Sequence, residues 1–108
     1  AGYVEGALEG MQADLVFLGI GGLERLGERH ASAYWAEHVR RVKAGCVVPV
    51  HWDNFTLPFG TIEASPGLAT SLGWLGKFAE RIDAHLAGVE FGKTVNAFDA
   101  TCGGQLAP

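Results

Sequence analysis

The chain has 108 residues, of which 48% are hydrophobic and 19% are charged, and this composition fits one compact domain rather than a disordered tail. Its 12 acidic and 8 basic residues give a net charge of −4 without a cluster of positive charge, so we expect no nucleic-acid partner. Because no apolar run reaches the roughly 18 residues that cross a bilayer, we expect a soluble, cytoplasmic protein with no membrane contact.

The first half of the chain predicts two helices and a buried strand. Residues 4–11 carry apolar side chains at helical spacing and predict a short amphipathic helix. The apolar run over residues 15–20 predicts a strand that is covered on both faces, and a Gly-Gly pair ends it. A second helix follows, with Ser32 as its N-cap. The buried face of that helix carries Trp35, Val39 and Val42.

The second half of the chain continues the alternation of strand and helix. A second buried strand is predicted over residues 46–51. Residues 53–70 have no sustained period and predict a long loop, a kind of segment that is often functional in compact domains. A third helix is predicted over residues 71–87 and a last strand over residues 89–98, and residues 101–108 are expected to form a loose tail.

Two cysteines, Cys46 and Cys102, are too few to define a disulfide framework. Cys46 opens a valine-rich run, where a thiol usually behaves as a small buried apolar group. We therefore expect both cysteines to be reduced.

The predicted element order is α-β-α-β-α-β, an α/β pattern that favours parallel strands joined by right-handed crossovers. If the strand order advances steadily, such crossovers put successive helices on the same face of the sheet. The first two strands look apolar on both faces, so the opposite face needs a cover that this chain hardly provides. We therefore expect residues 1–108 to form a single partial domain, one half of an αβ/βα sandwich. A missing N-terminal half or another subunit would cover the sheet.

Two short segments follow the predicted strands, at the edge of the sheet where α/β proteins bind ligands. These segments contribute Gly19, Gly21 and Gly22 after the first strand, and His51, Trp52, Asp53 and Asn54 after the second. The glycines allow the backbone to approach a ligand closely, or they form a plain turn. A phosphate site is disfavoured because the next predicted helix begins about ten residues later.

His51 is the strongest single candidate for chemistry, because its imidazole would lie in the crevice beyond the strand. Asp53 could accept a hydrogen bond from that imidazole or could cap the following turn. Trp52 could stack on a substrate, although packing is the commoner role. His30, in the loop after the first strand, could contact substrate or support the site. A purely structural His51 is the competing interpretation.

Three segments together resemble the C-terminal half of metallo-β-lactamase-fold hydrolases. They are residues 13–22, the Tyr34-Trp35 pair and residues 47–55. The resemblance is closest to the bacterial branch that is similar to the ascorbate-6-phosphate lactonases. It covers roughly residues 1–60 and extends further only through the order of elements. It implies that this chain is half of a metallo-β-lactamase-like αβ/βα sandwich.

The resemblance also implies a metal site. In such proteins a histidine that follows the last central strand, in a Pro-x-His-Trp-like context, is a metal ligand, and His51 matches that position. The intact protein would hold two divalent ions, zinc or manganese, and a bridging hydroxide. That hydroxide would attack an ester, lactone or phosphoester of a small-molecule substrate. The strand over residues 15–20 and its glycine turn would line the floor of the active site.

The sequence departs from the family in one respect, because it lacks the His-x-His-x-Asp-His motif, the further single histidine and the bridging aspartate. Catalytic zinc needs about three protein ligands, so His51 alone does not make a site. We therefore expect a C-terminal fragment that is inactive by itself. The alternative is a non-catalytic α/β binding or interaction module, in which His51 is structural and the uncovered sheet face binds another subunit.

Overall fold

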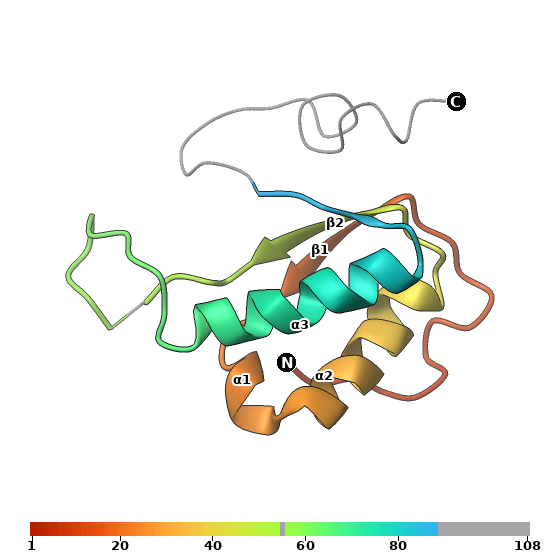
Figure 1. Ribbon diagram of the computed structural model, residues 1–108, viewed down its shortest axis with the longest axis horizontal. Helices are drawn as coiled ribbons and strands as arrows, with labels where there is room; N and C mark the ends of the chain where they lie inside the picture. Colours follow the sequence, from red (N-terminus) through yellow and green to blue (C-terminus); the bar gives the residue numbers. More distant parts are fainter. Residues whose placement is uncertain (55, 89–108) are drawn as a thin grey trace.

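The computed structural model describes residues 1–54 and 56–88, which form a small mixed α/β arrangement (Figure 1). The elements in chain order are β1 (Leu15–Gly19), α1 (Leu23–Leu26), α2 (Glu28–Trp35), the π-helix η1 (Ala36–Arg40), β2 (Cys46–Val50), α3 (Leu68–Arg81) and β3 (His85–Leu86). The α/β class is confirmed, although the first helix of the expected order is missing and the chain opens on turns.

The described strands form a parallel sheet in the order β1-β2-β3, as the alternation of elements predicted. Strands β1 and β2 pair along their whole length, from Leu15 opposite Cys46 to Gly19 opposite Val50. Strand β3 is short and pairs only with Cys46 and Val47. The strands predicted over residues 15–20 and 46–51 are therefore present, and each ends one residue earlier than predicted.

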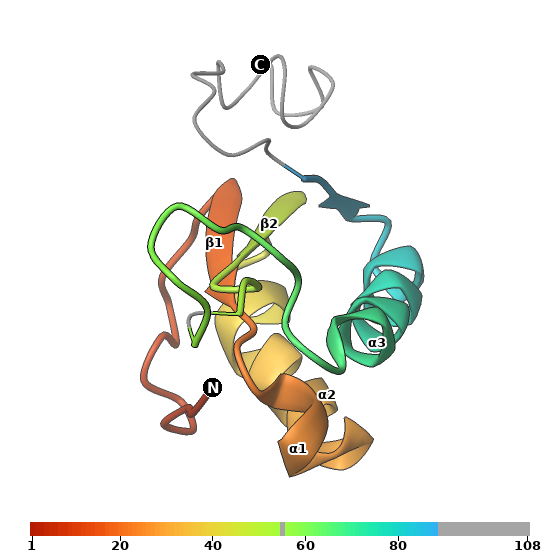
Figure 2. The ribbon, with the colours of Figure 1, turned by 90° about the vertical axis from the view of Figure 1, so that its left-hand side faces the viewer.

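All described helices lie on the same side of the sheet, as a comparison of the two ribbon views shows (Figures 1 and 2). Leu18 of β1 and Val47 of β2 are buried in the core between the sheet and the helices. The helices contribute Trp35, Val39, Val42, Leu75, Phe78 and Ala79 to this core. Within the described ranges, no helix is long and apolar enough to cross a bilayer.

The opposite face of the sheet is less uniformly covered. Phe17, which alternates with the buried Leu18, is 62% exposed, whereas Cys46 on the neighbouring strand is fully buried beside Ala87. The two-residue period of a strand turns successive side chains to opposite faces, which explains the contrast between Phe17 and Leu18. Cys46 shares the face of Phe17, because it pairs with Leu15. The Cys46 sulfur is not a free thiol, which contradicts the expectation of a reduced residue. Cys102 lies outside the described residues.

The helix expected over residues 4–11 is not formed. Successive tight turns replace it, with hydrogen bonds from the Ala7 N–H to the Val4 carbonyl and from the Glu9 N–H to the Gly6 carbonyl, both 3.1 Å long. Gly6 and Gly10 adopt φ values of 76° and 81°. These left-handed values interrupt a helix, and glycine adopts them without steric cost. The helical spacing of apolar residues over residues 4–11 therefore predicted a helix that the glycines prevent.

The second helical segment begins earlier than expected. Helix α2 starts at Glu28, directly after Gly27, so Ser32 lies inside the helix and is not its N-cap. The chain then continues as η1, a π-helical stretch whose wider turns carry it to Arg40. The expected buried face is confirmed, because Trp35, Val39 and Val42 are each at most 4% exposed.

The third helix is displaced toward the N-terminus relative to its predicted range. Helix α3 spans Leu68–Arg81, and the chain leaves the helix at Ile82 and Asp83, where Asp83 has a φ of 54°. The residues that follow form β3 instead of the last helical turn. The strand expected over residues 89–98 and the loose tail expected over residues 101–108 lie outside the described residues.

Candidate functional site

A cavity of about 340 Å³ lies beyond the carboxyl ends of β1 and β2. Its lining consists of Gly21, Gly22, Glu24, Arg25, His51, Asp53, Asn54, Thr56, Ser65 and Pro66. The cavity therefore brings together the two strand-end segments that the sequence singled out, as expected for ligand sites in parallel sheets. Gly21 and Gly22 come from the first segment, and His51, Asp53 and Asn54 come from the second.

His51 occupies its place because of the strand that precedes it. The Ile20 N–H donates to the Val50 carbonyl at 3.0 Å, which keeps the two chains aligned one residue beyond β1. His51 then adopts a φ of 57°, a left-handed value that is uncommon for a residue with a side chain. The residue is exposed, so its imidazole belongs to the cavity lining and not to the hydrophobic core.

Gly21 provides the surface against which the His51 ring lies. A Cβ atom at this position would come within 2.7 Å of both Cε1 and Nδ1 of His51. Real side chains do not approach so closely, so any other residue at position 21 would displace the imidazole. Gly21 therefore determines where the His51 ring can lie.

A β-bridge within the loop after β2 positions the other polar residues of the cavity. Asp53 pairs with Ala64 in an isolated antiparallel bridge, and the Ser65 N–H donates to the Trp52 carbonyl at 2.8 Å. This bridge returns Ser65 to the cavity, where sequence reasoning did not place it. The residues expected to be one long irregular loop thus contain a folded segment.

Asn54, rather than Asp53, holds the turn that follows the bridge. Its Oδ1 accepts hydrogen bonds from the backbone N–H of Thr56 at 3.1 Å and from the Thr56 hydroxyl at 2.5 Å. Such a side-chain-to-backbone bond two residues ahead is a common way for asparagine to stabilise a turn. Thr56 was also missed at the sequence level, although an Asn-x-Thr spacing is the signal that could have identified this turn.

Glu24 of α1 connects the cavity to the start of α3. Its Oε2 accepts a hydrogen bond of 3.4 Å from the Ser71 hydroxyl, and its Oε1 lies 3.9 Å from Nε of the largely exposed Arg25. A Cβ at Gly67, which precedes α3, would overlap the Glu24 side chain. Glu24 thus fits against a glycine that is 43 positions further along the chain, and no local pattern indicates that contact.

Three of the singled-out residues, Gly19, His30 and Trp52, do not line this cavity. His30 Nε2 lies 2.7 Å from the Ala1 carbonyl oxygen, and its ring is close to those of Tyr3 and Tyr34. The Gly19 carbonyl accepts a hydrogen bond of 2.6 Å from the Tyr34 hydroxyl. Burial raises the pKa of Tyr34, which keeps its hydroxyl protonated as a donor.

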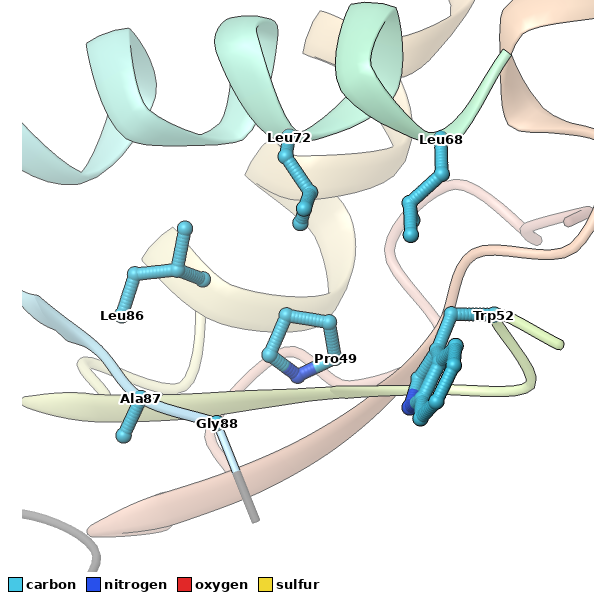
Figure 3. Close-up of a pocket in the computed structure, with 7 residues that line it drawn as sticks. All are labelled: Pro49, Trp52, Leu68, Leu72, Leu86, Ala87 and Gly88. Carbon is cyan, nitrogen blue, oxygen red and sulfur yellow. The ribbon is translucent and has the colours of Figure 1, made fainter. Parts of the chain in front are cut away.

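Trp52 lines a second cavity, of about 410 Å³, between the sheet and α3 (Figure 3). The lining comprises Pro49, Trp52, Leu68, Leu72, Leu86, Ala87 and Gly88. The side chains of Leu68 and Leu72 point from α3 toward Pro49, and the Trp52 ring flanks one side (Figure 3). Sequence reasoning did not anticipate this cavity, because its walls come from three separate segments.

The polar cavity does not contain a complete metal site from the described residues. Among residues 1–54 and 56–88, no group of three or more His, Cys, Asp or Glu side chains is arranged to hold a metal ion. A catalytic zinc ion needs about three protein ligands, so the donor set present here does not fit a metal ion unless other ligands are added. None of three comparisons, with protein-family models, curated proteins and solved structures, finds a match to this chain.

Proposed function

We propose that the chain is the C-terminal part of a metal-dependent hydrolase that acts on an ester, lactone or phosphoester, and that His51 is one of the metal ligands. The observation that supports this most directly is the placement of His51. Its exposed imidazole lies at the carboxyl edge of a parallel sheet, in a polar cavity, next to a glycine that leaves room for the ring. Ligand-binding residues of α/β sheets are found in this position.

The remaining ligands would come from a segment or subunit other than the described residues. This requirement follows from the incomplete donor set around His51. In hydrolases of this kind, a divalent ion polarises the bond to be broken and activates water. The residues of this chain would contribute orientation, because Gly21 restricts where the imidazole can lie and Asn54 holds the turn beside it.

The test compares two histidine variants of the intact protein. His51→Ala should lower the bound metal content and reduce turnover by orders of magnitude, whereas the control His38→Ala should leave both unchanged. His38 is suitable because it lies on η1, outside the cavity lining, with its ring tilted against that of Tyr34 at 4.7 Å between centroids. Metal content would be measured by elemental analysis, and thermal melts would be recorded with and without chelator.

The chelator separates a ligand from a structural residue. If His51 binds metal, the stability that its replacement removes is metal-linked, so chelator should abolish the difference between the wild type and the variant. A melting shift that persists in full with chelator, together with equal metal content in both proteins, would overturn the assignment of His51 as a ligand.

A non-catalytic interaction module remains the second candidate, and a specific observation favours it. Phe17 is 62% exposed on the sheet face that the described helices leave uncovered. A contiguous exposed apolar patch marks a protein interface, and Phe17 would be the centre of such a patch on this face. This candidate predicts binding of a protein partner without any dependence on metal, which the same chelator experiment distinguishes.

A further inference from the structure

We propose that the apolar cavity beside α3 binds the apolar part of a small-molecule substrate, an acyl chain or an aryl ring. The described residues that line it are Pro49, Trp52, Leu68, Leu72, Leu86, Ala87 and Gly88. This inference rests on the proposed hydrolase function, since it assigns a substrate class to that site. The cavity itself is tested without metal or turnover.

The chemistry of the lining defines the class of ligand. Every described lining residue is apolar or glycine, and none carries an ionisable group. Its volume of about 410 Å³ falls within the range of about 300 to 1,000 Å³ that is usual for small-molecule sites. Trp52 offers a large aromatic surface, which suits a flat ring or an extended chain. A charged or strongly hydrated ligand would lose its hydration there without compensation.

The backbone at His51 explains why the apolar cavity lies beside the polar one. In a regular strand, Pro49 and Trp52 would face opposite sides of the sheet, because they are three residues apart. The left-handed conformation of His51, with a φ of 57°, interrupts this alternation. As a result Trp52 lines the same cavity as Pro49, while His51 lines the polar cavity.

This arrangement suits a ligand with two chemically different ends. A polar, hydrolysable group would lie near His51, and the apolar part would lie against Trp52. The two cavities share no described lining residue, and only a single peptide bond separates His51 from Trp52. Specificity for an apolar substituent would therefore depend on Trp52, Leu68 and Leu72, and not on the residues of the polar cavity.

Binding of octanol and butanol to the intact protein, measured by calorimetry in the presence of chelator, tests the inference. Octanol should bind at least about tenfold more tightly than butanol, because its longer chain buries more apolar surface. Leu72→Gln should weaken octanol binding by about tenfold, since an amide would enter the apolar wall. The matched control is Leu26→Gln on α1, a leucine that is 51% exposed and outside the cavity.

A second substitution, Leu68→Gln, guards against a folding defect in the first, and circular dichroism would establish that each variant is folded. Equal affinities for octanol and butanol, or equal affinities of the Leu72 and Leu26 variants for octanol, would overturn the inference. The alcohol affinities are measured with chelator present, so they do not depend on metal binding at His51. The proposal for the cavity and the proposal for the metal ligand can therefore be refuted independently. Alcohol affinity tests the first, and metal content tests the second.

Discussion

At the scale of single residues, the candidate site depends on the fit between His51 and Gly21. His51 adopts a left-handed backbone conformation, which costs a residue with a side chain about 1–2 kcal/mol. The surrounding structure must offset this cost, and a hydrogen bond of 3.0 Å from the Ile20 N–H fixes the Val50 carbonyl directly before His51. Gly21 then leaves the space that the imidazole occupies.

Gly21→Ala should displace the His51 ring, because the added Cβ would come within 2.7 Å of Nδ1 and Cε1. In the intact protein we expect metal affinity to fall by about tenfold or more, as is typical when the orientation of a metal ligand is disturbed. Metal titration checks this. The control is Gly19→Ala, whose Cβ would meet the Tyr34 hydroxyl at an ordinary 3.9 Å. Equal metal affinities for the two variants would contradict the role assigned to Gly21.

At the scale of elements, η1 holds the N-terminal turns against the domain. Glu37 of this π-helix accepts hydrogen bonds from Arg41 Nε and Nη2, both 2.8 Å long. It also accepts one from the Gly6 N–H at 3.1 Å. The N-terminal turns, where a short amphipathic helix was expected over residues 4–11, are thus attached partly through a carboxylate 31 positions beyond Gly6.

Glu37→Gln should destabilise the protein in a pH-dependent way. Hydrogen bonds from Arg41, and next the Gly6 N–H, hold the pKa of Glu37 below its usual range. Because the folded pKa is lower than the unfolded one, the ionised carboxylate stabilises the fold above the unfolded pKa of about 4.3. That stabilisation is lost as the pH falls through the folded pKa.

Thermal melts over a pH series check this expectation. The melting temperature of Glu37→Gln should be lower than that of the wild type near neutral pH, and the difference should shrink below about pH 4. Glu80→Gln, at an exposed position on α3, serves as the control and should show little change. A difference that stays constant across the series would show that the carboxylate charge is not responsible.

At the scale of the whole molecule, the sheet carries described helices on one face only (Figure 2). The covered face contains Leu18 and Val47 in the main core, and the other face presents Phe17 with 62% of its surface exposed. Burying a phenylalanine side chain is worth about 1.5–3 kcal/mol, so a second layer over this face would add to stability.

The isolated chain should therefore self-associate through the exposed part of this face around Phe17. Phe17→Ser should shift it toward the monomer in sedimentation experiments and reduce the binding of a hydrophobic dye. Phe59→Ser is the matched control, because Phe59 is fully exposed but lies in the loop after β2 and not on the sheet. A sharp monomer peak for the wild-type chain, without dye binding, would contradict the one-sided sheet as an interface.

The sequence by itself determined the features that depend on neighbouring residues. Continuous apolar runs were enough to predict the positions of β1 and β2. The expected cover on both faces is wrong for β1, because its Phe17 is exposed. Helical spacing was enough to identify the buried face that includes Trp35 and Val39. The end of β2 then located His51, since a residue directly after a parallel strand lies at the ligand-binding edge.

Only the tertiary structure decided the features that depend on contacts between distant segments. Glu24 reaches the start of α3 because Gly67 leaves room for it, and Ser65 returns to the site through a bridge between Asp53 and Ala64. Neither contact has a local signature. Contacts between distant segments also explain the N-terminal turns. The apolar residues there have helical spacing, but left-handed glycines and the hydrogen bond from the Gly6 N–H to Glu37 favour turns instead of a helix. The local sequence pattern thus determined where most helices and strands form. Tertiary packing determined which polar side chains those elements bring together.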